Sequence, residues 1–214
     1  MQQYETYIRL AVFLLVFIFF ALSTGKIMEG ISRSFASMFD LRKLLRIDRE
    51  LLLKVNRNYA LAFLILLVAF LLSFHTRIFA KTLALDPLLL FLIICCAFAV
   101  YLLYRGGLLA LLDAIRGTKT FLTVNRFFRN YLIISLLLTA VGDLVYFFVP
   151  SLSPELLIHW IIISCAVPYV VYLYMASSHI FKNNFSLLLY ILYICALEIL
   201  PAAAALKFAL GAGN

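Results

Sequence analysis

Charged residues are scarce in this chain of 214 residues: they make up 13% of it, whereas 66% of the residues are hydrophobic. The mean hydropathy is +1.09. Soluble domains are about 45–50% apolar and about 25% charged, so the composition excludes a soluble globular protein. The chain also lacks linkers rich in Gly, Ser or Pro and shows no internal repeat. We therefore expect a single integral membrane domain over residues 1–214.

The motifs of soluble enzymes are absent as well. There is no glycine-rich phosphate loop, no H-E-x-x-H and no G-x-S-x-G. The three histidines (His75, His159 and His179) fall at different helix ends, and the membrane thickness separates His179 from the other two, which argues against a shared metal site. The four cysteines have no C-x-x-C spacing, as is typical of reduced structural thiols. We expect no catalytic site, no metal, no cofactor and no nucleic-acid partner.

Six apolar runs are long enough to cross a bilayer, which takes about 17–25 residues in a helix. They lie at about 8–24, 59–75, 87–104, 131–149, 156–176 and 187–208. The runs are continuously apolar, whereas membrane-spanning strands alternate between apolar and polar residues. The pattern predicts an all-α polytopic membrane protein with six transmembrane helices.

Basic residues are unevenly distributed between the two sides of these spans. The segments 25–58, 105–130 and 177–186 hold 14 of the 18 Lys and Arg residues, and the other side holds four. Short cytoplasmic loops carry an excess of Lys and Arg. We therefore expect these three loops in the cytoplasm and both termini outside. The net charge of +8 is first of all a topology signal.

Two of the basic loops carry amphipathic helical patterns, which predict interfacial helices. The spacing of apolar residues is helical, and arginines share another face. The residues that form the candidate interface are Phe35, Phe39, Arg42, Arg46 and Arg49 in the first loop and Phe127 and Phe128 in the second. Such helices rest on anionic lipid at the cytoplasmic face or dock another subunit. We also expect Gly106-Gly107 to end the third span, so that residues 108–116 turn along the membrane surface.

Two carboxylates lie well inside the expected spans. Asp143 and Glu198 fall about 12 and 11 residues after the cytoplasmic starts of their spans, which puts each roughly 17–18 Å deep at 1.5 Å per residue. A carboxylate at such a depth costs about 2.5–3.5 kcal/mol and should face the protein interior. Three roles stay open: hydrogen bonds that hold helices together, proton or ion handling, or contact with a basic residue of another subunit.

Two prolines interrupt the spans. Pro168 and Pro201 cannot donate to the carbonyl groups of Ser164 and Leu197, so we expect helix breaks there. In lipid the freed carbonyl groups must find other donors. Candidate hydroxyl donors are Tyr146, Tyr169, Tyr172, Tyr190 and Tyr193.

Three stretches carry a family likeness. The segments RSFASMFDLRKLLR (33–46), RNYLIISLLL (129–138) and NNFSLLLYILYICALEILP (183–201) resemble an uncharacterised bacterial inner-membrane family, domain of unknown function 4271. The most specific part runs from Ile194 to Pro201 and includes Glu198, whereas Asp143 lies outside the pattern. The resemblance implies a polytopic bacterial inner-membrane protein and supplies no activity.

From these observations we expect a non-enzymatic inner-membrane protein that serves as an accessory or assembly subunit of a larger membrane complex. The alternative is a proton- or ion-linked transporter or channel that uses Asp143 and Glu198. The two hypotheses differ in the surroundings of the buried acids, because transport requires a wet path and a structural role requires dry, hydrogen-bonded packing.

Overall fold

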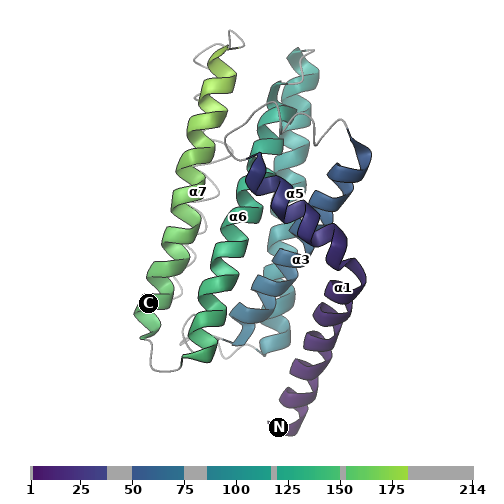
Figure 1. Ribbon diagram of the computed structural model, residues 1–214, viewed down its shortest axis with the longest axis vertical. Coiled ribbons are helices and arrows are strands. Elements are labelled where there is room, and N and C mark those ends of the chain that lie inside the picture. Colours follow the sequence, from purple (N-terminus) through teal and green to yellow (C-terminus); the bar gives the residue numbers. More distant parts are fainter. Residues whose placement is uncertain (1, 38–49, 75–85, 117–119, 150–152, 183–214) are drawn as a thin grey trace.

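The computed structural model describes residues 2–37, 50–74, 86–116, 120–149 and 153–182, and these residues form a helical bundle (Figure 1). The helices are α1 (Gln2–Ala36), α3 (Leu51–Phe74), α5 (Pro87–Arg116), α6 (Thr120–Phe148) and α7 (Pro154–Lys182). All five are long and apolar enough to span a membrane. The all-α multi-pass architecture is confirmed for these five helices. The expected sixth span at 187–208 lies outside the described residues.

The helices are longer than their apolar runs. α6 begins at Thr120, eleven residues before the expected start of its span at 131. α5 runs unbroken to Arg116, so the expected end at Gly106-Gly107 is wrong. Two glycines inside a helix cost roughly 1–2 kcal/mol together. That cost is offset here because the same stretch of α5 buries Leu109 completely in the core.

The turn from α5 to α6 is held by a side chain of the preceding helix. The carboxylate of Asp113 accepts hydrogen bonds from the backbone N–H groups of Phe121 (2.9 Å) and Leu122 (2.7 Å). The first N–H groups of a helix lack intrahelical partners, and the helix dipole favours a negative charge at that end. Asp113 therefore fixes the start of α6 directly against the end of α5.

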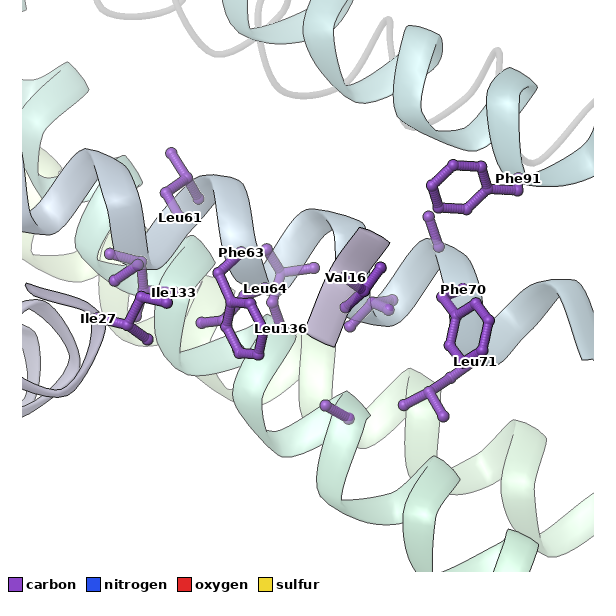
Figure 2. Close-up of a cluster of buried hydrophobic side chains, with 14 residues drawn as sticks. Val16, Ile27, Leu61, Phe63, Leu64, Phe70, Leu71, Phe91, Ile133 and Leu136 are labelled. Carbon is purple, nitrogen blue, oxygen red and sulfur yellow. The ribbon is translucent and has the colours of Figure 1, made fainter. Parts of the chain in front are cut away.

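Two clusters of buried side chains form the core. The first joins α1, α3 and α6 with one buried residue of α5, and Figure 2 shows Val16, Leu64, Phe91 and Ile133 of these four helices spread along the cluster. The second cluster joins α5, α6 and α7. Its members are Leu109, Phe121, Val124, Phe127, Phe128, Tyr131, Tyr172, Ala176 and Ile180. α6 contributes to both clusters and is the central helix of the bundle.

Glycines allow two of the closest helix crossings. A Cβ atom at Gly30 of α1 would lie 2.8 Å from the Cβ of Ala60 on α3. A Cβ atom at Gly142 of α6 would overlap the indole ring of Trp160 on α7, whose Nε1–H donates to the carbonyl oxygen of Leu138 (2.8 Å). Small residues of this kind let membrane helices approach closely. The two glycines thus set the α1–α3 and α6–α7 spacings.

Candidate functional site

A fully buried arginine lies where three helices meet. Arg105 is 0% exposed and comes 18 residues after the first residue of α5. Its Nη1–H donates to the hydroxyl of Tyr101 (3.2 Å), one turn earlier, and its Nη2–H donates to the hydroxyl of Tyr172 on α7. The guanidinium carbon lies 3.8 Å from the ring centroid of Phe128 on α6. Helices α5, α6 and α7 each contribute a contact to the guanidinium group.

Protein groups of three helices stabilise the positive charge of Arg105. A guanidinium group inside a membrane protein is costly and needs polar partners, and the two hydroxyls supply acceptors. The face of an aromatic ring attracts a cation by about 2 kcal/mol or more when both are desolvated. The tyrosine hydroxyls and the phenylalanine ring are neutral groups, and each of them stabilises the charge of Arg105.

The structure places Phe127 and Phe128 in the protein interior, not at the membrane surface where we expected them. They are 2% and 8% exposed. Phe127 packs edge-on against His179 of α7, and Phe128 against Tyr172. The helical stripe that they form is real, but it faces the neighbouring helices because α6 already runs inside the bundle at this point. We expected the pair at the membrane surface, but both side chains belong to the second core cluster.

Two arginines that the sequence assigned to loops lie inside helices. Arg105 was expected at the start of the loop 105–130, and Arg57 at the end of the loop 25–58, yet Arg57 is 2% exposed within α3. The spacing of Tyr101 and Arg105 at i and i+4 was a usable signal, because such pairs share a helix face. The contact between Arg105 and Tyr172 could not be predicted from the sequence, because the two residues are 67 positions apart in the chain.

Most residues of the first candidate interface are not described. Phe39, Arg42, Arg46 and Arg49 lie outside the described residues, as do Glu198 and Pro201. Phe35 belongs to the last turn of α1 and is 45% exposed. This residue therefore presents its ring at the end of a helix long enough to span a membrane.

Asp143 is fully buried near the far end of α6. It is 0% exposed, and neither carboxylate oxygen has a hydrogen-bond partner among the described residues. It lies 23 residues after the start of α6 and five before its end. The helix start at Thr120 does not fix where the membrane begins, and Glu198 lies outside the described residues, so the expected level shared by the two acids stays a prediction. Along α6, Asp143 is about 22 Å from Phe128, which separates the buried acid from the Arg105 cluster.

The carbonyl group freed by Pro168 has found a donor. Pro168 lies within α7, and the hydroxyl of Ser135 on α6 donates to the carbonyl oxygen of Ser164 (2.8 Å). The need for such a donor followed from the sequence, but the donor is a serine and not one of the candidate tyrosines. The helix continues from Pro154 to Lys182 without a break. The carbonyl group that Pro168 leaves without a donor in α7 thus forms a hydrogen bond between α6 and α7.

Other polar side chains also join neighbouring helices. Asn56 of α3 donates to the carboxylate of Glu29 on α1 (2.6 Å). Asn130 of α6 donates to the hydroxyl of Ser37, the residue after α1 (2.8 Å). Together with the contacts above, such bonds connect α1, α3, α5, α6 and α7 into one network. Much of the polar content of these membrane helices is therefore used for helix–helix contact.

An apolar groove lies on the surface between α3 and α5. Its volume is about 410 Å³. The residues that line it are Asn58, Leu61, Ala62, Ile65, Leu66, Cys95, Ala99, Leu102 and Arg129. Neither Arg105 nor Asp143 reaches it, so the groove is no path to the buried charges.

No metal site is found in the part of the chain that the structure describes, where no three His, Cys, Asp or Glu side chains gather closely enough. Three of the cysteines, Cys95, Cys96 and Cys165, are free thiols. His159 lies against the backbone carbonyl of Glu155, one turn earlier, at 2.6 Å. These side chains supply no constellation for chemistry within the described helices.

Comparison with known proteins gives one match. No curated protein and no solved structure matches the chain. A family model described as a domain of unknown function, DUF4271, matches residues 6–209 and therefore nearly the whole chain. The family resemblance of the sequence is confirmed, and the chain belongs to the DUF4271 family.

Proposed function

We propose that this protein is a non-enzymatic accessory or assembly subunit of a larger complex in the bacterial inner membrane. The observation that carries the proposal is a group of exposed apolar side chains at one end of the bundle. Phe35 ends α1, Leu51 and Leu52 begin α3, and Ile115 ends α5, and all four are 45–76% exposed. Exposed apolar groups that gather at a membrane–water boundary are typical of contact sites for lipid or protein.

The orientation that we propose puts this end in the cytoplasm. The connections between α1 and α3 and between α5 and α6 belong to the two most basic segments of the chain, and such segments stay on the cytoplasmic side. Both termini are then periplasmic. A subunit docked here would meet apolar side chains flanked by Arg33 and Lys54, a combination suited to an acidic, amphipathic partner helix.

The polar network supports a structural role. Glu29, Asn130 and Ser135 each take part in a bond between different helices, at 2.6–2.8 Å. Groups that bind each other are unavailable to a passing solute, and the groove between α3 and α5 is lined mostly by apolar side chains. These features are expected of a rigid scaffold in a complex more than of a conduit.

Purification from native membranes tests the proposal. The tagged protein is extracted in mild detergent, and copurifying proteins are identified by mass spectrometry. We expect one or more membrane proteins at a fixed ratio, which Phe35→Asp should remove. The control is Val100→Asn, at a position 65% exposed in the middle of α5, and it should leave the partners in place. Recovery of the isolated protein alone, from cells with native expression, would contradict the proposal.

A second candidate, proton- or ion-linked transport, is favoured by Asp143. Ionisable residues inside membrane helices often mark ion pathways, and both carboxylate oxygens of this residue lack hydrogen-bond partners among the described residues. Under this hypothesis Asp143→Asn should abolish flux in proteoliposomes while the protein stays folded. Under the subunit proposal the wild type and Asp143→Asn should both show only background flux. Glu198 lies outside the described residues, so its part in transport stays a prediction.

A further inference from the structure

The groove between α3 and α5 has one polar end and one apolar end. Figure 1 shows the two helices running in opposite directions. Asn58 lies in the first third of α3 and Arg129 in the first third of α6, and Leu102 is the last of the three α5 residues that line the groove, so these three line the same end. Leu66 and Cys95 line the other end. Between the two ends, the wall is made of the side chains of Leu61, Ala62, Ile65 and Ala99.

The length of the groove matches one lipid leaflet. From Asn58 to Leu66 the helix rises by about 12 Å, at 1.5 Å per residue. The hydrocarbon core of a bilayer is about 30 Å thick, so one leaflet contributes about 15 Å. The apolar wall is thus long enough for the part of an acyl chain that lies within one leaflet, and the polar end falls near the headgroup level.

The polar end is positively charged. Arg129 makes one hydrogen bond among the described residues, to the amide oxygen of Asn58 at 3.4 Å, although a guanidinium group carries five N–H donors. Lys54 lies one turn before Asn58 on α3, and Arg126 one turn before Arg129 on α6. Residues at these spacings share a helix face. An anion at the mouth of the groove would therefore meet Arg129, and Lys54 and Arg126 add positive charge one turn away, although they do not line the groove.

We propose that this groove is a binding site for an anionic phospholipid. One acyl chain lies along the apolar wall, and the phosphate group binds the guanidinium of Arg129 and the amide N–H of Asn58. A planar guanidinium group is well suited to phosphate oxygens. The apolar lining disfavours a water-soluble ligand, and the cationic end selects an anionic headgroup over a zwitterionic one.

Native mass spectrometry of the purified protein, titrated with phosphatidylglycerol or phosphatidylcholine, tests the proposal. The wild type should bind phosphatidylglycerol more tightly, with one preferred site. Arg129→Gln should weaken phosphatidylglycerol binding about tenfold, as expected for the loss of one charge-assisted hydrogen bond, and should weaken phosphatidylcholine binding less, so that the preference for phosphatidylglycerol shrinks. The matched control is Arg33→Gln, which removes an arginine that is exposed on α1 and does not line the groove.

A second pair of variants tests the apolar wall. Ala99→Trp fills the groove and should reduce binding of both lipids, whereas Ala97→Trp adds the same ring at an exposed position of α5 outside the groove and should not. Equal affinity of the wild type for the two lipids, or no effect of Ala99→Trp, overturns the proposal. A loss of oligomer mass with Ala99→Trp and no change in lipid binding would overturn it too, because a second copy of the chain would then occupy the groove.

Discussion

The hydroxyl of Tyr172 is expected to stabilise the bundle because it accepts a hydrogen bond from the buried guanidinium group of Arg105. The variant Tyr172→Phe removes this oxygen and keeps the aromatic ring, which packs against Phe128 and Tyr131 in the second core cluster. The change is therefore a test of the hydrogen bond and not of packing.

The expected loss can be bounded from two sides. Hydrogen bonds that involve a charged group contribute about 1.5–3 kcal/mol, whereas bonds between membrane helices average about 0.6 kcal/mol and reach about 1.7 kcal/mol. Both Arg105 and Tyr172 are 0% exposed, so water cannot replace the lost acceptor. We expect Tyr172→Phe to lower the free energy of unfolding by about 1.5 kcal/mol, at the upper end of the membrane range.

Unfolding can be followed in mixed detergent micelles by the fluorescence of the single tryptophan. Trp160 is the only tryptophan of the chain and packs between α6 and α7 over Gly142. Separation of these helices should change its emission. The control is Tyr174→Phe on the same helix, because Tyr174 is 73% exposed and exposed substitutions usually change stability by less than about 0.5 kcal/mol.

A double-mutant cycle isolates the contact. Arg105→Met removes the charge and keeps a long apolar side chain, so in this background Tyr172→Phe should cost less than about 0.5 kcal/mol. The coupling between the two positions should then be about 1 kcal/mol or more, as for residues in direct contact. A hydrogen bond between Arg105 and Tyr172 that stabilises the bundle is refuted if Tyr172→Phe costs no more than Tyr174→Phe, or if its cost is the same with and without Arg105.

Three further variants, two in α6 and one in α5, can be tested with the same unfolding assay. Gly142→Ala should destabilise the protein by about 1–3 kcal/mol because the added methyl group meets the ring of Trp160. By contrast, Gly107→Ala should stabilise it by up to about 1 kcal/mol, since no atom lies within 4 Å of the added Cβ; equal effects at the two glycines would contradict the close crossing. Ser135→Ala should cost about 0.5–1.5 kcal/mol, because the carbonyl group that Pro168 leaves free loses its donor, and a neutral result would mean that another group replaces it.

The sequence predicted the parts of the fold that depend on local hydropathy. Five of the apolar runs coincide with membrane-length helices. The ends were less predictable, because a helix continues as long as its backbone hydrogen bonds do, whether or not its side chains face lipid. We expected the segment before 131 to form an interfacial helix because Asn125 and Arg126 lie opposite its apolar residues. In the bundle those residues extend α6, and Asn125 is 7% exposed.

The candidate site was only partly predictable for a related reason. An arginine after an apolar run, followed by two glycines, is typical of a loop, and so Arg105 was counted with the cytoplasmic charges. Its burial depends on Phe128 and Tyr172, which come from other helices. The sequence could predict that the carbonyl group of Ser164 needs another donor, because a proline four residues later always lacks the backbone N–H that would bind it. Its donor was not, since a tertiary contact decides which hydroxyl lies nearby.

The burial of two arginines also bears on the orientation of the chain in the membrane. Arg57 and Arg105 are 2% and 0% exposed, so they interact with protein and are weak topology signals. Without them, twelve basic residues remain on the proposed cytoplasmic side, against four on the other. The bias is thus strong enough to keep the same orientation.

In that orientation Arg129 and the polar end of the groove face the cytoplasmic leaflet, whose anionic lipids attract basic segments near the membrane by about 1 kcal/mol per Lys or Arg. In the proposed orientation, the basic segments and the arginine that we assign to lipid binding therefore lie at the same leaflet. Basic residues added at positions 150–152 are expected to reverse the orientation and thereby to weaken the selectivity for phosphatidylglycerol in the membrane. Retained selectivity in such a variant would show that the groove reads the lipid headgroup alone.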